Sequence, residues 1–113
     1  MTRLPIDDEH APLYSLGQVA AMLNVQQAFL RRLDEHRVVS PQRSAGGQRR
    51  YSRRDITLVQ YVTELANEGM TLVAIRRILE LEEELRTLRR ELEDVHNRLA
   101  ARDRDRDEPA GGG

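Results

Sequence analysis

The chain has 113 residues, of which 39% are hydrophobic and 33% are charged, and its formal net charge is −1. This length allows one small domain and little more, and the absence of cysteine excludes disulfides, thiolate metal sites and thiol redox sensing. No apolar run approaches the ~20 residues that span a bilayer and no signal-peptide pattern opens the chain, so we expect a soluble cytoplasmic protein without membrane association.

The N-terminal part of the chain predicts a lead followed by one short helix. Residues 1–12 carry two prolines and no hydrophobic period, and we expect them to be disordered. Ser15 can cap a helix while Gln18 reaches back to it, which is the capping-box pattern. Asn24 is expected to end this helix in the left-handed conformation after two turns. The apolar face of the helix comprises Leu16, Val19, Ala20 and Leu23.

A second helix is predicted from about Gln26 to His36, with Phe29, Leu30 and Leu33 facing inward. Two short helices separated by a tight turn form a helix-turn-helix, and its second member would be the recognition helix that presents side chains to base edges. The residues of this helix expected to face outward and contact DNA are Gln26, Gln27, Arg31 and Arg32.

Residues 38–51 predict two short strands around a Ser-Ala-Gly-Gly turn at 44–47, because the glycines permit the positive φ angles of a hairpin tip. Such a hairpin beside a helix-turn-helix is a wing, and its arginines would straddle the phosphate backbone or enter the minor groove. The wing residues expected to contact DNA are Arg43, Arg49, Arg50 and Tyr51.

The charge distribution supports this interpretation. Residues 26–54 contain eight arginines and two acidic residues, a net charge of +6 in a chain that is nearly neutral as a whole. Clustered arginine on a helix and a hairpin is the electrostatic footprint of a nucleic-acid binder. A merely solvated basic face is the alternative, and the placement of the charge on two elements that fit adjacent grooves argues against it.

Two further helices are predicted after the wing. Ser52 and Asp55 form a second capping box, and Gly69 closes the helix that it opens. Thr71 can cap the next helix, whose first turns carry a second set of apolar residues that face the core. The apolar stripe of the first of these helices is Ile56, Val59, Val62 and Leu65, with Ala66 beside it, and that of the second is Leu72, Ile75, Ile78 and Leu79.

The C-terminal third shows a heptad pattern in which apolar residues alternate spacings of three and four. A helix from Thr71 to Arg102 would be about 45 Å long at 1.5 Å per residue. The narrow apolar stripe along it is too long for one small domain to bury. Self-association is therefore favoured over packing back on the same domain. Residues 103–113 are low-complexity and expected to be disordered. The predicted dimer interface comprises Ile78, Leu81, Leu85, Leu88, Leu92, Val95 and Leu99.

The sequence argues against an enzyme. The three histidines fall in the lead, at a helix end and in the coiled-coil segment, so none of them is placed to share a metal. The Gly46-Gly47 pair lacks the flanking strand and helix of a phosphate-binding loop, and residues 82–84 form a solvated acidic face. We expect no catalytic residue, no metal and no cofactor.

Residues 14–81 resemble the N-terminal domain of the MerR family of bacterial transcription regulators. The resemblance is carried by YSLGQVAAMLNV, VVSP, the wing pattern R-x-x-GG-x-RRYS-x-x-D and TLVAIRRIL. The phrases VVSPQRSAGGQRRYSRRDI and LVAIRRILELEEEL are most similar to the heat-shock repressor branch. The resemblance implies a homodimer joined by an antiparallel coiled coil, which binds an inverted repeat in promoter DNA and acts there as a repressor rather than as an activator, although the sequence alone leaves both signs of regulation open. By position, Arg31 would be the recognition-helix arginine, and Arg49 and Tyr51 would touch the DNA backbone.

The chain departs from the family pattern within the recognition helix. Arg32-Leu33 replaces an aromatic pair, Arg37 replaces a glycine and Phe29 stands where threonine is frequent, which bears on base preference and not on architecture. The cysteines of the metal-sensing members are missing, and we expect no drug-binding domain and no small-molecule effector. A regulatory signal is instead expected through a protein co-regulator or the cellular concentration of the protein, and the third alternative is that no signal acts on it.

The resulting prediction is an all-α protein with a small β-hairpin wing: a winged helix-turn-helix over residues 13–80, followed by a long coiled-coil helix over 81–102. Its predicted function is sequence-specific binding of double-stranded promoter DNA, at the nucleoid. The alternatives are a protein-binding adaptor or chaperone modulator built on the same fold, suggested by Leu33 and Arg37, and an architectural DNA-bending protein. The arginines of the wing favour the transcription regulator, since an adaptor has no need of them.

Overall fold

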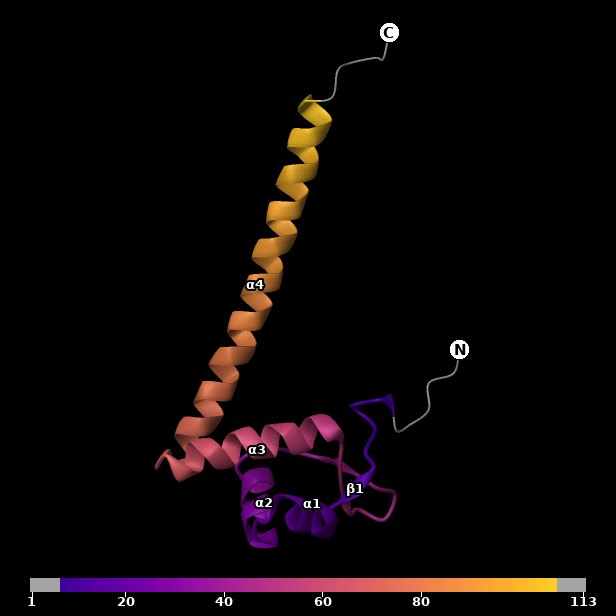
Figure 1. Ribbon diagram of the computed structural model, residues 1–113, viewed down its shortest axis with the longest axis vertical. Coiled ribbons are helices and arrows are strands. Elements are labelled where there is room, and N and C mark those ends of the chain that lie inside the picture. The colour runs from indigo at the N-terminus through magenta and orange to yellow at the C-terminus, as the bar shows by residue number, and fades with distance from the viewer. Residues whose placement is uncertain (1–6, 108–113) are drawn as a thin grey trace. The chain divides into compact units, whose positions relative to one another are not determined.

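The computed structural model of the protein describes residues 7–107, and within them the chain forms four helices and three very short strands (Figure 1). It divides into two compact units between Ile78 and Leu79. The elements in chain order are β1 (Tyr14–Ser15), α1 (Leu16–Leu23), α2 (Gln27–Glu35), β2 (Gln42–Arg43), β3 (Arg49–Tyr51), α3 (Arg53–Asn67) and α4 (Leu72–Asp107).

Helices α1 and α2 form the helix-turn-helix, and α1 begins with the predicted capping box. The Ser15 Oγ accepts a hydrogen bond from the Gln18 amide at 3.2 Å, and the Gln18 Oε1 accepts one from the Ser15 amide at 2.8 Å. Asn24 ends the helix in the left-handed conformation with φ 52°, also as predicted. Leu30 and Leu33 of α2 are buried, so this helix turns its apolar side to the core.

The three strands form one antiparallel sheet in the order β1-β3-β2. The predicted hairpin is present, with Arg43 opposite Arg49, but it is shorter than expected and its central strand also pairs with β1. Val38 and Val39, which we assigned to the first strand of the wing, are instead buried core residues. Arg37 takes a left-handed φ of 57°, and the amides of both valines then donate to the Leu33 carbonyl at the end of α2.

Helix α3 begins with the second predicted capping box, in which the Ser52 Oγ accepts from the Asp55 amide at 3.0 Å and Asp55 Oδ2 accepts from the Ser52 amide at 2.9 Å. Gly69 follows the helix with φ 93°, and Thr71 Oγ1 accepts from the Ala74 amide as α4 starts. The predicted stripe of α3 is buried together with one residue of α4. The buried residues are Ile56, Val59, Val62, Leu65 and Ile75.

The segment before β1 lies against the domain where we expected a disordered lead. The Arg54 amide donates to the Glu9 carbonyl, the Leu13 amide donates to the Tyr51 carbonyl, each at 3.1 Å, and Ala11 is buried. The Leu13 bond continues the pairing of β1 with β3, and the Glu9 carbonyl accepts from the first turn of α3. A hydrophobic pattern reveals neither contact. The rest of the predicted lead, residues 1–6, lies outside the described residues.

The second unit consists of the α4 helix from Leu79 onward, which continues to Asp107 and so beyond the predicted end at 102. No glycine or proline interrupts the chain there, and Arg104 and Arg106 in the last turn complement the helix dipole. The remainder of the predicted disordered tail, residues 108–113, lies outside the described residues. No helix within residues 7–107 is both long and apolar enough to traverse a lipid bilayer.

Candidate nucleic-acid interface

The outer face of α2 carries the four polar residues that the sequence assigns to base contacts, and all four are exposed. Gln27 Oε1 accepts a hydrogen bond from Arg31 Nη2 at 3.3 Å, so these two side chains lie side by side at the start of the helix. Phe29, expected in the core, is only half-buried, and its ring lies 5.8 Å from the Arg32 guanidinium carbon. A cation–π contact with the Phe29 ring therefore stabilises the position of the Arg32 guanidinium.

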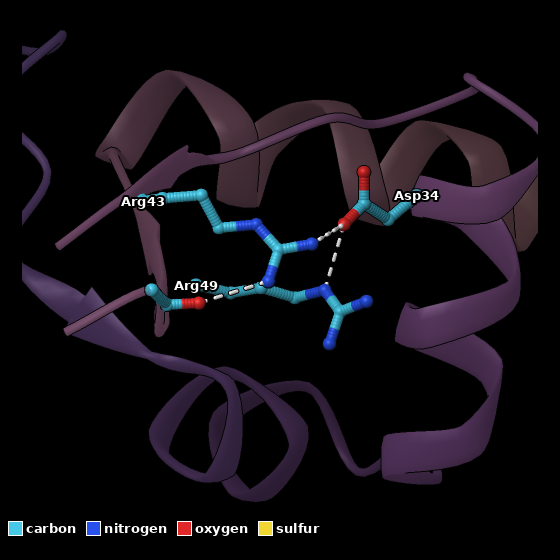
Figure 2. A network of polar contacts seen from close by, with 4 residues as sticks. Asp34, Arg43 and Arg49 are labelled. Atoms are coloured by element: carbon cyan, nitrogen blue, oxygen red, sulfur yellow. Dashed lines mark hydrogen bonds and ion pairs between the residues drawn. The ribbon is translucent and has the colours of Figure 1, made fainter.

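The wing is tied to α2 by one carboxylate (Figure 2). Asp34 Oδ2 accepts a hydrogen bond from Arg49 Nε at 2.7 Å and another from Arg43 Nη2 at 3.0 Å. Arg43 Nη1 also donates to the Gly47 carbonyl at 3.0 Å, which braces the turn from inside. Asp34 was not predicted as a site residue, because nothing in the sequence distinguishes it from the adjacent Glu35 or points to partners nine and fifteen residues away.

An arginine-lined hollow of about 420 Å³ lies between α1, α2 and the wing. The first residues of α1 form one wall, and their backbone amides and helix dipole favour an anion there. Arg31 comes from α2, and the other three arginines come from the wing. The complete lining is Ser15, Leu16, Gly17, Arg31, Arg43, Gly47, Gln48, Arg49 and Arg50. In chemical terms this hollow can hold a phosphate-sized anion by charge-assisted, bidentate hydrogen bonds.

The structure thus brings four of the eight predicted DNA-contacting residues around one hollow. Gln26, Gln27 and Arg32 do not line it but are exposed on α2. Arg50 also donates to Gln48 Oε1 at 3.4 Å, within the wing. The recognition helix therefore shares the hollow with the wing through Arg31, while its other predicted contact residues are exposed outside it.

Tyr51 is a correction to the predicted site. Its side chain is 0% exposed, so it cannot touch a DNA backbone. It is the residue at which β3 passes into α3, and it pairs with Tyr14 of β1, so the domain encloses the ring. Burial raises the pKa of its hydroxyl, with opposing contributions from the charges of Arg49 and Asp34. Tyr51 is a core residue that lies close to the arginine network.

The predicted dimer residues lie on the second unit, with Ile78 at its boundary. Ile78 is half-buried, whereas the other six are between 41% and 61% exposed. These are high values for leucine and valine, and they recur at heptad spacing along one helix. No three side chains of histidine, aspartate or glutamate within residues 7–107 come together in a way that would hold a metal ion.

Comparison with known proteins identifies the class to which this architecture belongs. Residues 14–82 match the family described as MerR HTH family regulatory protein. The chain therefore belongs to the MerR family of helix-turn-helix regulatory proteins. The resemblance drawn from the wing and helix motifs is confirmed.

Individual relatives agree with this assignment. The chain is 41% identical over 81 residues to the putative heat shock protein HspR of Streptomyces coelicolor, covering 71% of this chain and 54% of that protein. It is 29% identical over 77 residues to the transcriptional regulator GlnR of Bacillus cereus, covering 68% and 60% respectively. The matched region thus spans little more than half the length of these relatives.

Two solved structures share the fold. The first is HiNmlR, described as a MerR family regulator lacking the sensor domain and bound to promoter DNA, with a TM-score of 0.57 and 24% identity over 83% of this chain and 82% of that one. The second is a MerR family regulator from Bacillus cereus, with a TM-score of 0.55, 22% identity and 87% coverage of both chains. The predicted helical fold with its small β-hairpin is confirmed by these likenesses.

Proposed function

We propose that the protein binds a specific inverted repeat in double-stranded promoter DNA as a homodimer and acts there as a repressor. The observation that carries this proposal is the arginine-lined hollow beside the exposed polar face of α2. The solved relative HiNmlR, which is bound to promoter DNA, supports the same partner for this chain. Promoter binding would place the protein at the nucleoid.

In this proposal α2 reads bases and the wing holds the backbone. Arg31 and Arg32, with Gln26 and Gln27, enter the major groove, where each good bidentate base contact contributes about 1–3 kcal/mol of discrimination. A phosphate occupies the hollow and is held by Arg49 and Arg50 together with the amides at the start of α1. Phosphate contacts fix the register of the protein on the duplex and carry no sequence information themselves.

The homodimer is supported by the uncovered apolar stripe of α4. Leu85, Leu88 and Leu92 lie at its centre and are about half exposed, an arrangement that a second copy of the same helix would bury by knobs-into-holes packing. A dimer with twofold symmetry matches two half-sites of an inverted repeat, whereas a monomer contacts one. The resemblance of the wing and α4 sequences to the heat-shock repressor branch supports repression, by occlusion of the promoter.

The decisive experiment is selection of bound duplexes from genomic fragments with the tagged full chain, followed by affinity measurements on the enriched site. Arg31→Ala should relax specificity at one base position, and Arg49→Ala should weaken binding to all duplexes alike while lowering the salt slope by about 1. Arg90→Ala is the matched control, because it removes the same charge from the exposed side of α4.

Three outcomes distinguish the proposed DNA-binding regulator from the protein-binding adaptor. Enrichment of inverted repeats at promoters, with little change for Arg90→Ala, is the expected result. Equal affinity of the Arg31→Ala/Arg49→Ala double variant and the wild type for the enriched site would contradict the proposed interface. Failure to enrich any duplex, with proteins captured instead, would favour the adaptor.

A further inference from the structure

We propose that Asp34 is a positioning residue of the DNA-binding surface: it fixes the wing on the recognition helix and aims the free end of Arg49 at the DNA backbone. The proposal rests on the proposed DNA-binding function, because it assigns the wing arginines their separate roles within it. It concerns a carboxylate that lies outside all the sequence motifs that carry the family resemblance.

The geometry places Asp34 at the junction of two elements. Its Oδ2 accepts hydrogen bonds from Arg49 Nε at 2.7 Å and Arg43 Nη2 at 3.0 Å, across fifteen and nine residues of sequence. The side chain of Asp34 is only 15% exposed and that of Arg49 only 19%, against 50% for Arg43. Largely buried pairs are screened less by salt than surface pairs, so this contact persists at the ionic strengths at which proteins bind DNA.

The two arginines do not use Asp34 in the same way. Arg43 commits both terminal nitrogens within the protein, Nη2 to Asp34 and Nη1 to the Gly47 carbonyl. It therefore braces the turn of the wing against α2. Arg49 commits only Nε, and in Figure 2 its two terminal nitrogens point away from Asp34.

This division leaves Arg49 ready for an anion. Its terminal nitrogens make no hydrogen bond within residues 7–107, and Arg49 lines the hollow between α1, α2 and the wing. A guanidinium held at Nε presents its outer fork in one orientation, which is the geometry that binds a phosphate through two parallel hydrogen bonds. Arg49 can therefore donate to Asp34 through Nε and bind a phosphate through its terminal nitrogens at the same time.

Asp34 also limits how much positive charge the surface can offer. It is one of only two acidic residues among eight arginines in residues 26–54. Without it, Arg43 and Arg49 would lose their shared counter-charge, swing outward and find phosphates on any duplex. A site whose cations are few and fixed discriminates better between correct and incorrect registers than one whose cations are mobile. The consequence is that Asp34 raises specificity while lowering non-specific affinity.

Glu35 is a natural control for this inference. It follows Asp34 on the same helix, carries the same charge and is exposed, and it forms no ion pair with any residue that the structure describes. Glu35→Gln therefore tests the loss of one negative charge from the recognition helix without any effect on the positions of Arg43 and Arg49. Asp34→Asn removes the same charge together with the ionic contact.

The first measurement uses the free full-length protein and no DNA. Arginine side-chain NMR should show one Nε–H that exchanges slowly with water in the wild type, assigned to Arg49 by its loss in Arg49→Lys. Asp34→Asn should accelerate this exchange by at least tenfold, whereas Glu35→Gln should leave it unchanged. An Arg49 Nε–H that exchanges as fast in the wild type as in Asp34→Asn would overturn the proposal, whether or not the protein binds DNA.

The second measurement compares the enriched site with a random duplex over a range of salt concentrations. Glu35→Gln should raise the affinity for both by the same factor. Asp34→Asn should raise it for the random duplex, steepen the salt slope there by about one to two phosphates, and reduce the ratio of specific to random affinity roughly tenfold, the equivalent of one base contact. If Asp34→Asn leaves that ratio as Glu35→Gln does, Asp34 acts only as a charge and the positioning role is wrong.

Discussion

Tyr51 is the residue whose chemistry is least matched to its surroundings. Its hydroxyl is fully enclosed and has no hydrogen-bond partner within the described residues. Leaving a buried hydroxyl unpaired costs about 1–3 kcal/mol, whereas the ring itself fills the core. The ring therefore stabilises the domain, whereas the unpaired hydroxyl destabilises it.

Tyr51→Phe should thus keep the fold and raise the free energy of unfolding by about 1 kcal/mol, because it removes the unpaired oxygen without leaving a cavity. Tyr51→Ala should lower it by ~3–5 kcal/mol through the cavity that remains. Denaturant unfolding of both variants checks this. A loss of stability in Tyr51→Phe would mean that the hydroxyl has a partner in solution.

The same residue predicts an alkaline limit to stability. Burial raises the pKa of Tyr51 from its ordinary value of 10.0, so the folded chain holds this proton more tightly than the unfolded chain. Ionisation of this hydroxyl therefore leaves the free energy of unfolding unchanged below pH 10 and lowers it as the pH rises through the folded pKa. Unfolding measured from pH 8 to 11 should show a falling stability in the wild type and a smaller fall in Tyr51→Phe. Equal slopes in the two proteins would exclude this role.

Among the elements, the wing depends on one glycine and not on its neighbour. Gly47 has φ 81°, a conformation that costs an L-residue about 1–2 kcal/mol, while Gly46 has no positive φ and its nearest contact for an added Cβ would be Ser44 Oγ at 3.9 Å. Gly47→Ala should distort the turn that Arg43 braces and weaken DNA binding severalfold. Gly46→Ala, the matched control, should bind as the wild type does. Equal binding of the two variants would show that the turn does not position the arginines.

The sequence predicted those elements whose signals are local. The capping boxes at Ser15 and Ser52 and the stop at Asn24 each lie within a few residues, and all three are present as expected. Strand β1 was missed because two residues cannot show an alternating pattern. Half of the predicted DNA-contacting set lines the hollow, but Tyr51 was misplaced and Asp34 was missed. Both depend on contacts between segments that lie far apart in the sequence, which periodicity does not encode.

For the whole molecule, the stripe on α4 leads to a prediction about assembly. Leu88→Glu would bury an unpaired charge in the apolar seam, cost several kcal/mol and separate the dimer. Binding to an inverted repeat should be lost together with the dimer. Asn97→Glu adds the same charge on the outer side of the helix and should leave both intact. Analytical ultracentrifugation and binding assays measure the two effects, and a Leu88→Glu variant that stays dimeric would place the interface elsewhere.

The orientation of the two helices is the last property that follows from the stripe. Charge alone favours a parallel pair, in which Arg77 and Glu84 would each face an opposite charge on the partner helix. Exposed pairs of this kind contribute only ~0.5 kcal/mol each, so they do not outweigh the family resemblance, which implies an antiparallel pair. In an antiparallel pair centred near residue 91, position 84 of one copy lies beside position 98 of the other.

Single cysteines at these two positions separate the alternatives, because the natural chain contains none. Glu84→Cys and Arg98→Cys, mixed and oxidised, should give an efficient 84–98 cross-link between copies, since a disulfide requires Cα atoms within about 7 Å. Each variant oxidised by itself is the control and should cross-link poorly. Efficient 84–84 cross-linking would instead establish parallel helices, and the two helix-turn-helix units would then emerge from the same end of the coiled coil.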